Sequence, residues 1–221
     1  MLESDAHMAV LRALGARSVP VVSRGSRYVF AQVIKDVVDF LGLSDDTKPQ
    51  LSPSELAERY QNVVLNAAIR LCRQMPDDKL DNLLPNRPRS WLVLMHHLFQ
   101  IPETFLDMDE NGVQLTYESL TAPPPADMLT SQAVALFGEQ TRERFTRWWQ
   151  NAKSSDFSVE VEPYFGKTTR HEMLERTVWH SAQHTRQVAS LLEQTGVLPD
   201  RPLSSADISG LPLTDKVWDE S

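Results

Sequence analysis

The sequence predicts a mainly helical protein, in which four amphipathic helices form a bundle and a small α-β-β-α unit precedes them. Three observations support this fold class. Apolar residues recur at helical spacing along four long stretches, a proline-rich segment separates the second stretch from the third, and short β-branched runs gather near the N-terminus. This pattern is typical of a helix bundle with one long crossover between helices 2 and 3, rather than of a sheet protein.

The first 43 residues make up the small unit. Its expected elements are a helix, two short strands around an Arg-Gly-Ser turn, and a closing helix, at residues 6–14, 19–22, 28–30 and 33–41. Two short strands and two short helices bury little apolar surface by themselves. We therefore expect residues 1–43 to dock on the larger domain or on a partner chain, which leaves a homodimer open.

A polar linker at residues 44–51 separates this unit from the main domain, residues 52–196. The motif SPSE at residues 52–55 supplies a side-chain cap, a proline at the first helical position and a glutamate at the third. The first helix of the bundle is expected to begin there and to run to about Met75.

The second and third helices are separated by the long crossover. Ser90 can cap the second helix, and Pro102 is expected to kink or end it. Residues 107–129 contain DMDENG and APPPAD, which predict an irregular connection. The third helix is expected at about residues 131–151, and SVEVEPYFG then predicts a brief extended segment.

The fourth helix, TRHEMLERTVWHSAQHTRQVASLLEQTG at residues 169–196, carries the first chemical signal. Its ends are marked by a capping box at Thr169 and by Gly196. His180 and His184 are four residues apart and therefore share one face, so both imidazoles can reach one metal ion. Two histidines at this spacing also arise by chance, and a third ligand is needed to make a catalytic metal site.

The charge and the apolar runs of the sequence restrict the kinds of partner that we expect. The net charge is −8 and no cluster of lysines and arginines occurs, which argues against nucleic acid. No apolar run approaches the roughly 20 residues that span a bilayer, and the N-terminal residues do not have a signal-peptide pattern, so we expect a cytoplasmic protein without a membrane partner.

Residues 197–221 are expected to form an extended tail anchored by Trp218. The single cysteine, Cys72, lies in an apolar helical pattern and is expected to be buried and inert.

Two segments, SWLVLMHHLFQIPETFL and WHSAQHTRQVASLLEQTG, resemble the DinB-like family of metal-dependent thiol transferases and hydrolases. The resemblance covers residues 52–196 and implies that His97, His180 and His184 hold the metal ion. His96 is the alternative to His97, because the two are adjacent. Gln187 would orient a ligand imidazole or the substrate, or would simply be exposed to solvent.

A second resemblance concerns the small unit. LRALGARSVPVVSRGSRYVFAQVIKDVVDFLGL resembles the second half of a glutaredoxin, which implies a cis peptide bond between Val19 and Pro20 and a backbone edge at Val19 that binds glutathione. The half of a glutaredoxin that carries the catalytic cysteine motif has no counterpart here. No glutaredoxin redox activity is therefore expected.

These resemblances imply a metal-dependent thiol S-transferase, or an isomerase that uses the thiol as a cofactor, acting on a small electrophilic substrate. Zinc is the expected metal, with nickel and iron as alternatives, because imidazole ligands discriminate weakly among them. Glutathione is the expected thiol.

Two other functions stay open. A metal-dependent hydrolase would use the same ligands with water and a general base, for which Glu103 and Glu172 are candidates. A metal-binding stress-response module would have no turnover. An iron-dependent sulfoxide synthase of the ergothioneine type is disfavoured, because Arg186 stands where the H-x-x-x-H-x-E motif of those enzymes has glutamate.

Overall fold

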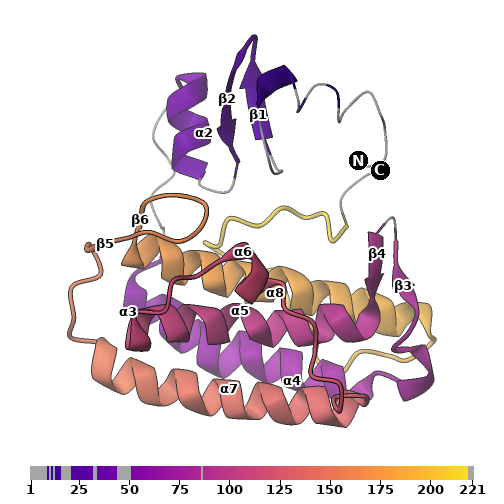
Figure 1. Ribbon diagram of the computed structural model, residues 1–221. Coiled ribbons are helices and arrows are strands. Elements are labelled where there is room, and N and C mark those ends of the chain that lie inside the picture. Colours follow the sequence, from indigo (N-terminus) through magenta and orange to yellow (C-terminus); the bar gives the residue numbers. More distant parts are fainter. Residues whose placement is uncertain are drawn as a thin grey trace.

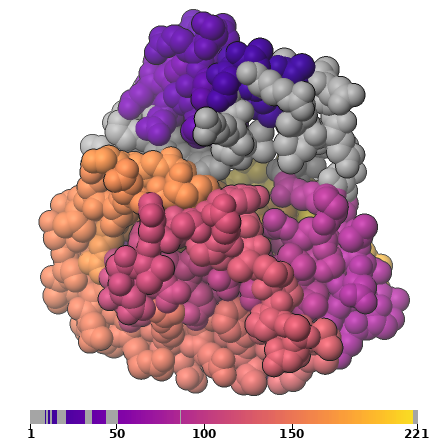
Figure 2. All heavy atoms as spheres, in the orientation of Figure 1, coloured from indigo at the N-terminus to yellow at the C-terminus, as the bar shows by residue number. Residues whose placement is uncertain are grey.

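The computed structural model describes residues 9, 11, 13–15, 21–31, 34–43, 51–85 and 87–218 (Figure 1). This part of the chain is mainly helical and contains three short antiparallel strand pairs. The prediction of a mainly helical protein is therefore confirmed. Figure 1 shows the long helices side by side in one body, with the strand pair of the N-terminal residues above them, and Figure 2 shows the same view with all heavy atoms as spheres.

The first long helical stretch is continuous but not uniform. It consists of α3 (Pro53–Arg59), a π-helical turn η1 (Tyr60–Val64) and α4 (Leu65–Gln74). Ser52 caps it, with the reciprocal bonds of a capping box to Glu55. The π turn was not predicted, and such turns often occur at functional sites.

Helix α5 (Trp91–Asn111) contains Pro102 in its interior, so of the two outcomes predicted for this proline, a kink or an end, the end does not occur. Pro102 has no N–H for the carbonyl of Leu98, one turn earlier. The hydroxyl of Ser181 in α8 (Arg170–Gln194) donates to that carbonyl at 3.1 Å, and the Tyr60 hydroxyl lies 2.8 Å from the same serine oxygen. A hydrogen bond from a neighbouring helix thus replaces the one that proline removes.

The connection into α5 holds more structure than the sequence indicated. It contains a 3₁₀ turn η2 (Asp77–Lys79) and the strand pair β3 (Leu83–Leu84) and β4 (Arg87–Ser90). Strand β4 leads directly into α5, whose first turn is capped by the side chain of Ser90 as predicted. Residues of β4 are therefore held close to the N-terminal half of α5.

The crossover begins later than predicted and is partly helical. Helix α5 continues to Asn111 and ends at Gly112, whose φ of 65° is the left-handed conformation that glycine adopts readily. The short helix α6 (Tyr117–Leu120) lies inside the crossover, capped by Thr116. Helix α7 (Ser131–Ala152) follows, with Thr130 as its cap.

Helices α5 and α7 approach each other closely at Gly138. A Cβ atom at this position would lie 2.5 Å from the ring of Phe99, so only glycine fits without displacing that ring. The predicted extended segment after α7 is present as β5 (Glu160–Val161), which pairs with β6 (Thr168–Thr169) just before α8. Thr169 and Glu172 form the predicted capping box of α8.

The core lies between the long helices. Helices α4 and α5 each pack against both α7 and α8. The largest side chains with almost no exposed surface are Tyr60, Phe99, Phe105, Phe145, Leu56 and Leu65. Removing this apolar surface from water is the main stabilising contribution, at roughly 25 cal/mol per Å².

The N-terminal unit is described only in part. Strand β1 (Val21–Arg24) pairs antiparallel with β2 (Arg27–Phe30), and α2 (Ile34–Leu41) packs beside β2. Val19 and Pro20, on which the glutathione prediction depends, lie outside the described residues, as do residues 44–50 of the expected linker. The glutaredoxin-like fold of this unit therefore stays a prediction.

Residues 197–218 run along the surface of the long helices and are fastened to them. Arg70 and Gln74 in α4 donate to the carbonyl oxygens of Asp200 and Leu198, at 2.8 and 3.1 Å. Near the other end, the indole N–H of Trp218 donates to Ser190 in α8 at 3.1 Å. Across the ranges described here, no helix is long and apolar enough to cross a membrane.

Candidate metal centre

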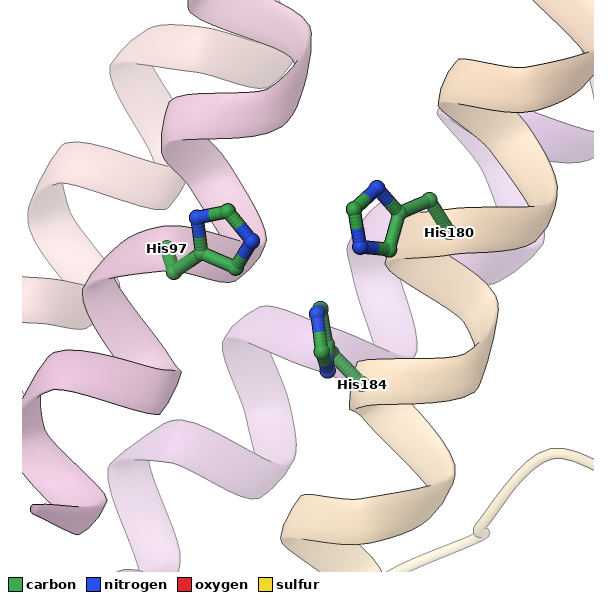
Figure 3. Close-up of side chains that lie close together, drawn as sticks. All are labelled: His97, His180 and His184. Atoms are coloured by element: carbon green, nitrogen blue, oxygen red, sulfur yellow. The ribbon is translucent and has the colours of Figure 1, made fainter. Parts of the chain in front are cut away.

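Three histidines from two helices point toward one another in the interior of the helical domain (Figure 3). His97 lies in α5, and His180 and His184 lie one turn apart in α8. The ring centroids are 5.4 Å apart for His97 and His180, 5.1 Å for His97 and His184, and 4.8 Å for the pair in α8. One nitrogen from each ring lies within 4.8 Å of the other two, so the three could hold a metal ion.

The ring of His97 is held by the crossover. Its Nδ1 lies 2.9 Å from the backbone carbonyl of Leu120 in α6. A carbonyl only accepts hydrogen bonds, so Nδ1 carries the proton and Nε2 carries the lone pair. This arrangement is the one that metal-ligating histidines usually have, with the second ring nitrogen bonded to a carbonyl or a carboxylate.

A chain of two hydrogen bonds sets the ring of His184 in the same way. The amide of Gln187 donates to the carbonyl of Val217 at 3.1 Å, and its oxygen lies 2.7 Å from Nδ1 of His184. Since that amide oxygen can only accept, Nδ1 of His184 is the protonated nitrogen and Nε2 carries the lone pair. Gln187 is therefore buried and engaged with a candidate ligand, and it is not exposed to solvent.

His96 does not belong to the group. It is buried, and its ring stacks on Phe137 of α7 at 5.4 Å with an interplanar angle of 16°. Adjacent residues on a helix point about 100° apart, so the two neighbouring histidines face different helices. The structure brings together His97, and not His96, with the pair in α8.

Burial favours the neutral form of His97 and His180. It lowers the pKa of His97 well below 6.5, and the charges of His184 and Arg89 lower it further. Burial also lowers the pKa of His180 well below 6.5, with smaller contributions from the other two histidines and then from Arg176 and Arg89. Neutral imidazoles have the lone pair that a metal ion requires.

The two glutamates considered as general bases have other partners. Glu103 forms an ion pair with Arg144 of α7, and Glu172 accepts hydrogen bonds from the backbone and hydroxyl of Thr169 at the start of α8. Among the residues that the structure describes, the group of candidate ligands contains no carboxylate. Cys72 is buried, and burial raises the pKa of its thiol, which agrees with the predicted inert role.

Sequence reasoning missed Arg89 in β4 and Arg176 in α8, whose charges help to lower the pKa of His180. Arg176 precedes His180 by four residues, so its place on the same helical face was readable from the spacing. Arg89 had no such signal, because its position depends on how β4 leads into α5. A separate open hollow of about 610 Å³ lies beside Ser52 and Phe157, and none of the three histidines lines it.

No family model matches the sequence, and no curated protein matches it. The likeness to the DinB-like family thus depends on the residues of the two segments alone.

Proposed function

We propose that this protein is a metal-dependent enzyme of the DinB-like type that joins a low-molecular-weight thiol to a small electrophile, or isomerises a substrate with the thiol as cofactor. The observation that carries the proposal is the group of three imidazoles, of which those of His97 and His184 are buried and each have Nδ1 beside an acceptor. Three protein ligands with a coordination position left for a small molecule are typical of catalytic metal sites, whereas four are typical of structural ones.

A divalent ion held there, with zinc expected and nickel or iron as alternatives, would supply Lewis acidity that lowers the pKa of a thiol or of water. The residues of the chain would bind the ion and orient the ligand rings. The carbonyl of Leu120 and the amide of Gln187 hold the rings of His97 and His184, so that little reorganisation is needed on binding.

The nucleophile is assigned to a separate thiol because the group of candidate ligands in the described residues contains no cysteine. The single cysteine, Cys72, lies in α4 and is buried in the core, and burial raises the pKa of its thiol. Glutathione is the thiol that the glutaredoxin-like resemblance of residues 11–43 favours. The order of the long helices, with the crossover between α5 and α7, agrees with the DinB-like bundle. The cytoplasmic location and the homodimer stay predictions from the sequence.

The test combines metal analysis with activity. The purified full chain is loaded with zinc, nickel or iron and assayed for glutathione-dependent conversion of a panel of electrophiles. His184→Ala should lower metal affinity by more than about a hundredfold, since losing only the hydrogen-bond partner of a ligand already costs 10- to 100-fold. It should abolish turnover while the helical circular dichroism spectrum is retained.

The matched controls are His96→Leu, which removes a buried histidine of the same helix as His97, and Cys72→Ala. Both should keep metal binding and turnover. Turnover that needs metal but no thiol would show a hydrolase, and a fully metallated protein that converts nothing would show a binding module. Either result would contradict the proposed thiol chemistry.

A further inference from the structure

The last described residues, 214–218, form a strap that runs beside α8 and is held there by side chains of that helix (Figure 1). The guanidinium of Arg186 donates to the carbonyls of Thr214 and Asp215, at 2.8 Å each. The indole N–H of Trp218 donates to a serine hydroxyl of the same helix at 3.1 Å. The bonds from Arg186 end on backbone oxygens, so they hold the main chain of the strap.

The carbonyl of Val217 connects the strap to the candidate metal centre. It accepts hydrogen bonds from the amide nitrogens of Gln183 and Gln187, at 2.8 and 3.1 Å. The amide oxygen of Gln187 lies 2.7 Å from Nδ1 of His184, whereas that of Gln183 accepts from Arg186 at 2.9 Å. The strap is therefore two hydrogen bonds away from His184, and the connection passes through Gln187.

These two bonds make the tautomer of His184 depend on the strap. While the amide nitrogen of Gln187 donates to the Val217 carbonyl, its oxygen accepts from Nδ1–H, and the imidazole has its lone pair on Nε2. Once the strap detaches, the amide can turn over and donate to Nδ1 instead. The proton of the imidazole would then be on Nε2, and neither ring nitrogen could bind a metal ion.

The two ends of this connection differ in burial. His184 and Gln187 are 8% and 9% exposed, so water does not readily replace the Val217 carbonyl as the acceptor of the Gln187 amide. The strap is exposed at residues 214–216 and partly buried at its last two described residues. Exposed segments of this kind open locally at little cost in free energy, so the strap can detach while the bundle stays folded.

We propose that metal binding at the histidine centre and docking of the strap are coupled through Gln187, so that the strap detaches more readily in the metal-free protein. This inference rests on the metal binding of the proposed function and not on its thiol chemistry. The metal ion favours the orientation of the Gln187 amide that the docked strap also favours. The coupling is reciprocal, so the ion tightens docking of the strap by the factor by which the strap tightens metal binding.

The first experiment uses the peptide bond after Lys216, which is exposed within the strap. Endoproteinase Lys-C cleaves this bond when the strap is detached, and mass spectrometry quantifies the released peptide VWDES. The full chain is digested metal-free and saturated with zinc, and cleavage after Lys153, at the end of α7, is the internal reference. Zinc should slow cleavage after Lys216, relative to the reference, by about tenfold or more, since proteolysis follows the population of the open state.

Gln187→Ala and Gln183→Ala separate the coupling from the attachment of the strap. Each variant lacks one donor to the Val217 carbonyl, so cleavage after Lys216 should be faster in both. At a zinc concentration that saturates it, Gln187→Ala should be cleaved as fast as in its metal-free form. Gln183→Ala should keep the zinc dependence of the wild type, because His184 keeps its partner.

The second experiment measures the reciprocal effect, the zinc affinity of the full chain in competition with a chelating dye. Arg186→Ala removes two bonds to the strap and leaves both His184 and Gln187 in place. It should lower zinc affinity by up to about 100-fold, the cost of losing the partner of a ligand. In a Gln187→Ala background it should lower the affinity no further. Arg73→Gln is the control, because Arg73 lies in α4 and pairs with Glu139 of α7, and its zinc affinity should equal that of the wild type.

The outcomes separate this inference from the proposed function. If the wild type binds neither zinc nor the alternative metals, both are wrong. If zinc binds but leaves cleavage after Lys216 unchanged, or if Gln187→Ala keeps the zinc dependence, the coupling is wrong and the proposed function stands. If the coupling is found in a protein without thiol-dependent turnover, the coupling stands and the thiol chemistry is wrong. The metal content and helical circular dichroism of each variant establish that it is loaded and folded.

Discussion

At the scale of single residues, Gln187 connects the candidate metal centre to the end of the described chain. It orients His184 through its amide oxygen and binds the Val217 carbonyl through its amide nitrogen. The Gln187 amide has an NH₂ donor and an oxygen acceptor at opposite ends. Donating to the Val217 carbonyl therefore turns its oxygen toward Nδ1 of His184. Val217 is thereby linked to a candidate ligand through Gln187.

Gln187→Ala should lower metal affinity by about 10- to 100-fold, because the ring of His184 loses the acceptor that fixes its tautomer. The measurement is competition for zinc against a chelating dye. Gln183→Ala is the matched control, since Gln183 also donates to the Val217 carbonyl, at 2.8 Å, but lies one turn away from the His184 contact. If Gln187→Ala and Gln183→Ala had the same zinc affinity, the hydrogen bond to His184 would make no contribution. The change in affinity would then come only from the lost bond to the Val217 carbonyl.

Residue spacing predicted part of the site. The four-residue interval of His180 and His184 was sufficient to place both on one face, and the structure shows them there. The choice between His96 and His97 depended on the rotation of α5 within the core, which no local pattern reports. Arg89 was missed for a related reason, because Tyr117 of α6, which acts on it electrostatically, is far away in sequence.

At the scale of elements, the pairing of α5 with α8 shows how a helix accommodates an internal proline. The carbonyl of Leu98 loses its helical donor at Pro102 and receives the hydroxyl of Ser181. Ser181 is adjacent to His180, and Leu98 is adjacent to His97. This hydrogen bond therefore fixes the register of the two helices at the metal centre.

Ser181→Ala should destabilise the protein by about 1 to 3 kcal/mol, because the buried Leu98 carbonyl and Tyr60 hydroxyl both lose a partner. In a Pro102→Ala background the cost should be smaller, since the new N–H can donate to Leu98 within the helix. Urea unfolding of the two single variants and the double variant gives the coupling between the two sites. Additive effects would contradict the account of Pro102 given above.

At the scale of the whole molecule, the helical class and most helix starts were predictable because they depend on local signals. The serine and threonine caps at residues 52, 90 and 169 are examples. The passage of α5 through Pro102, the π turn at Tyr60 and the helix inside the crossover were not predicted. The first depends on Ser181 of α8, which is distant in the sequence, and such tertiary contacts override local propensity.

The buried histidines make the stability of the whole metal-free protein depend on pH. His97 and His180 have a pKa well below 6.5 in the folded protein, mainly through burial, whereas the unfolded chain has the ordinary value. Below about pH 6.5 the unfolded state binds more protons, so stability that is fully present above that pH is lost as the pH falls. The free energy of unfolding should decrease by up to about 1.4 kcal/mol per pH unit for each of the two histidines.

Urea unfolding of the metal-free protein between pH 7.5 and pH 5, at intervals of half a unit, measures this slope. The carboxyl groups whose pKa is lowered, such as those of Glu55 and Glu172, have ordinary values of 4.5 and act mainly below this window. The double variant His97→Asn, His180→Asn should show a much shallower decline, because asparagine does not titrate. If the free energy of unfolding of the double variant falls as steeply with pH as that of the wild type, other groups cause the acid sensitivity. His97 and His180 would then be protonated in the folded protein as readily as in the unfolded chain.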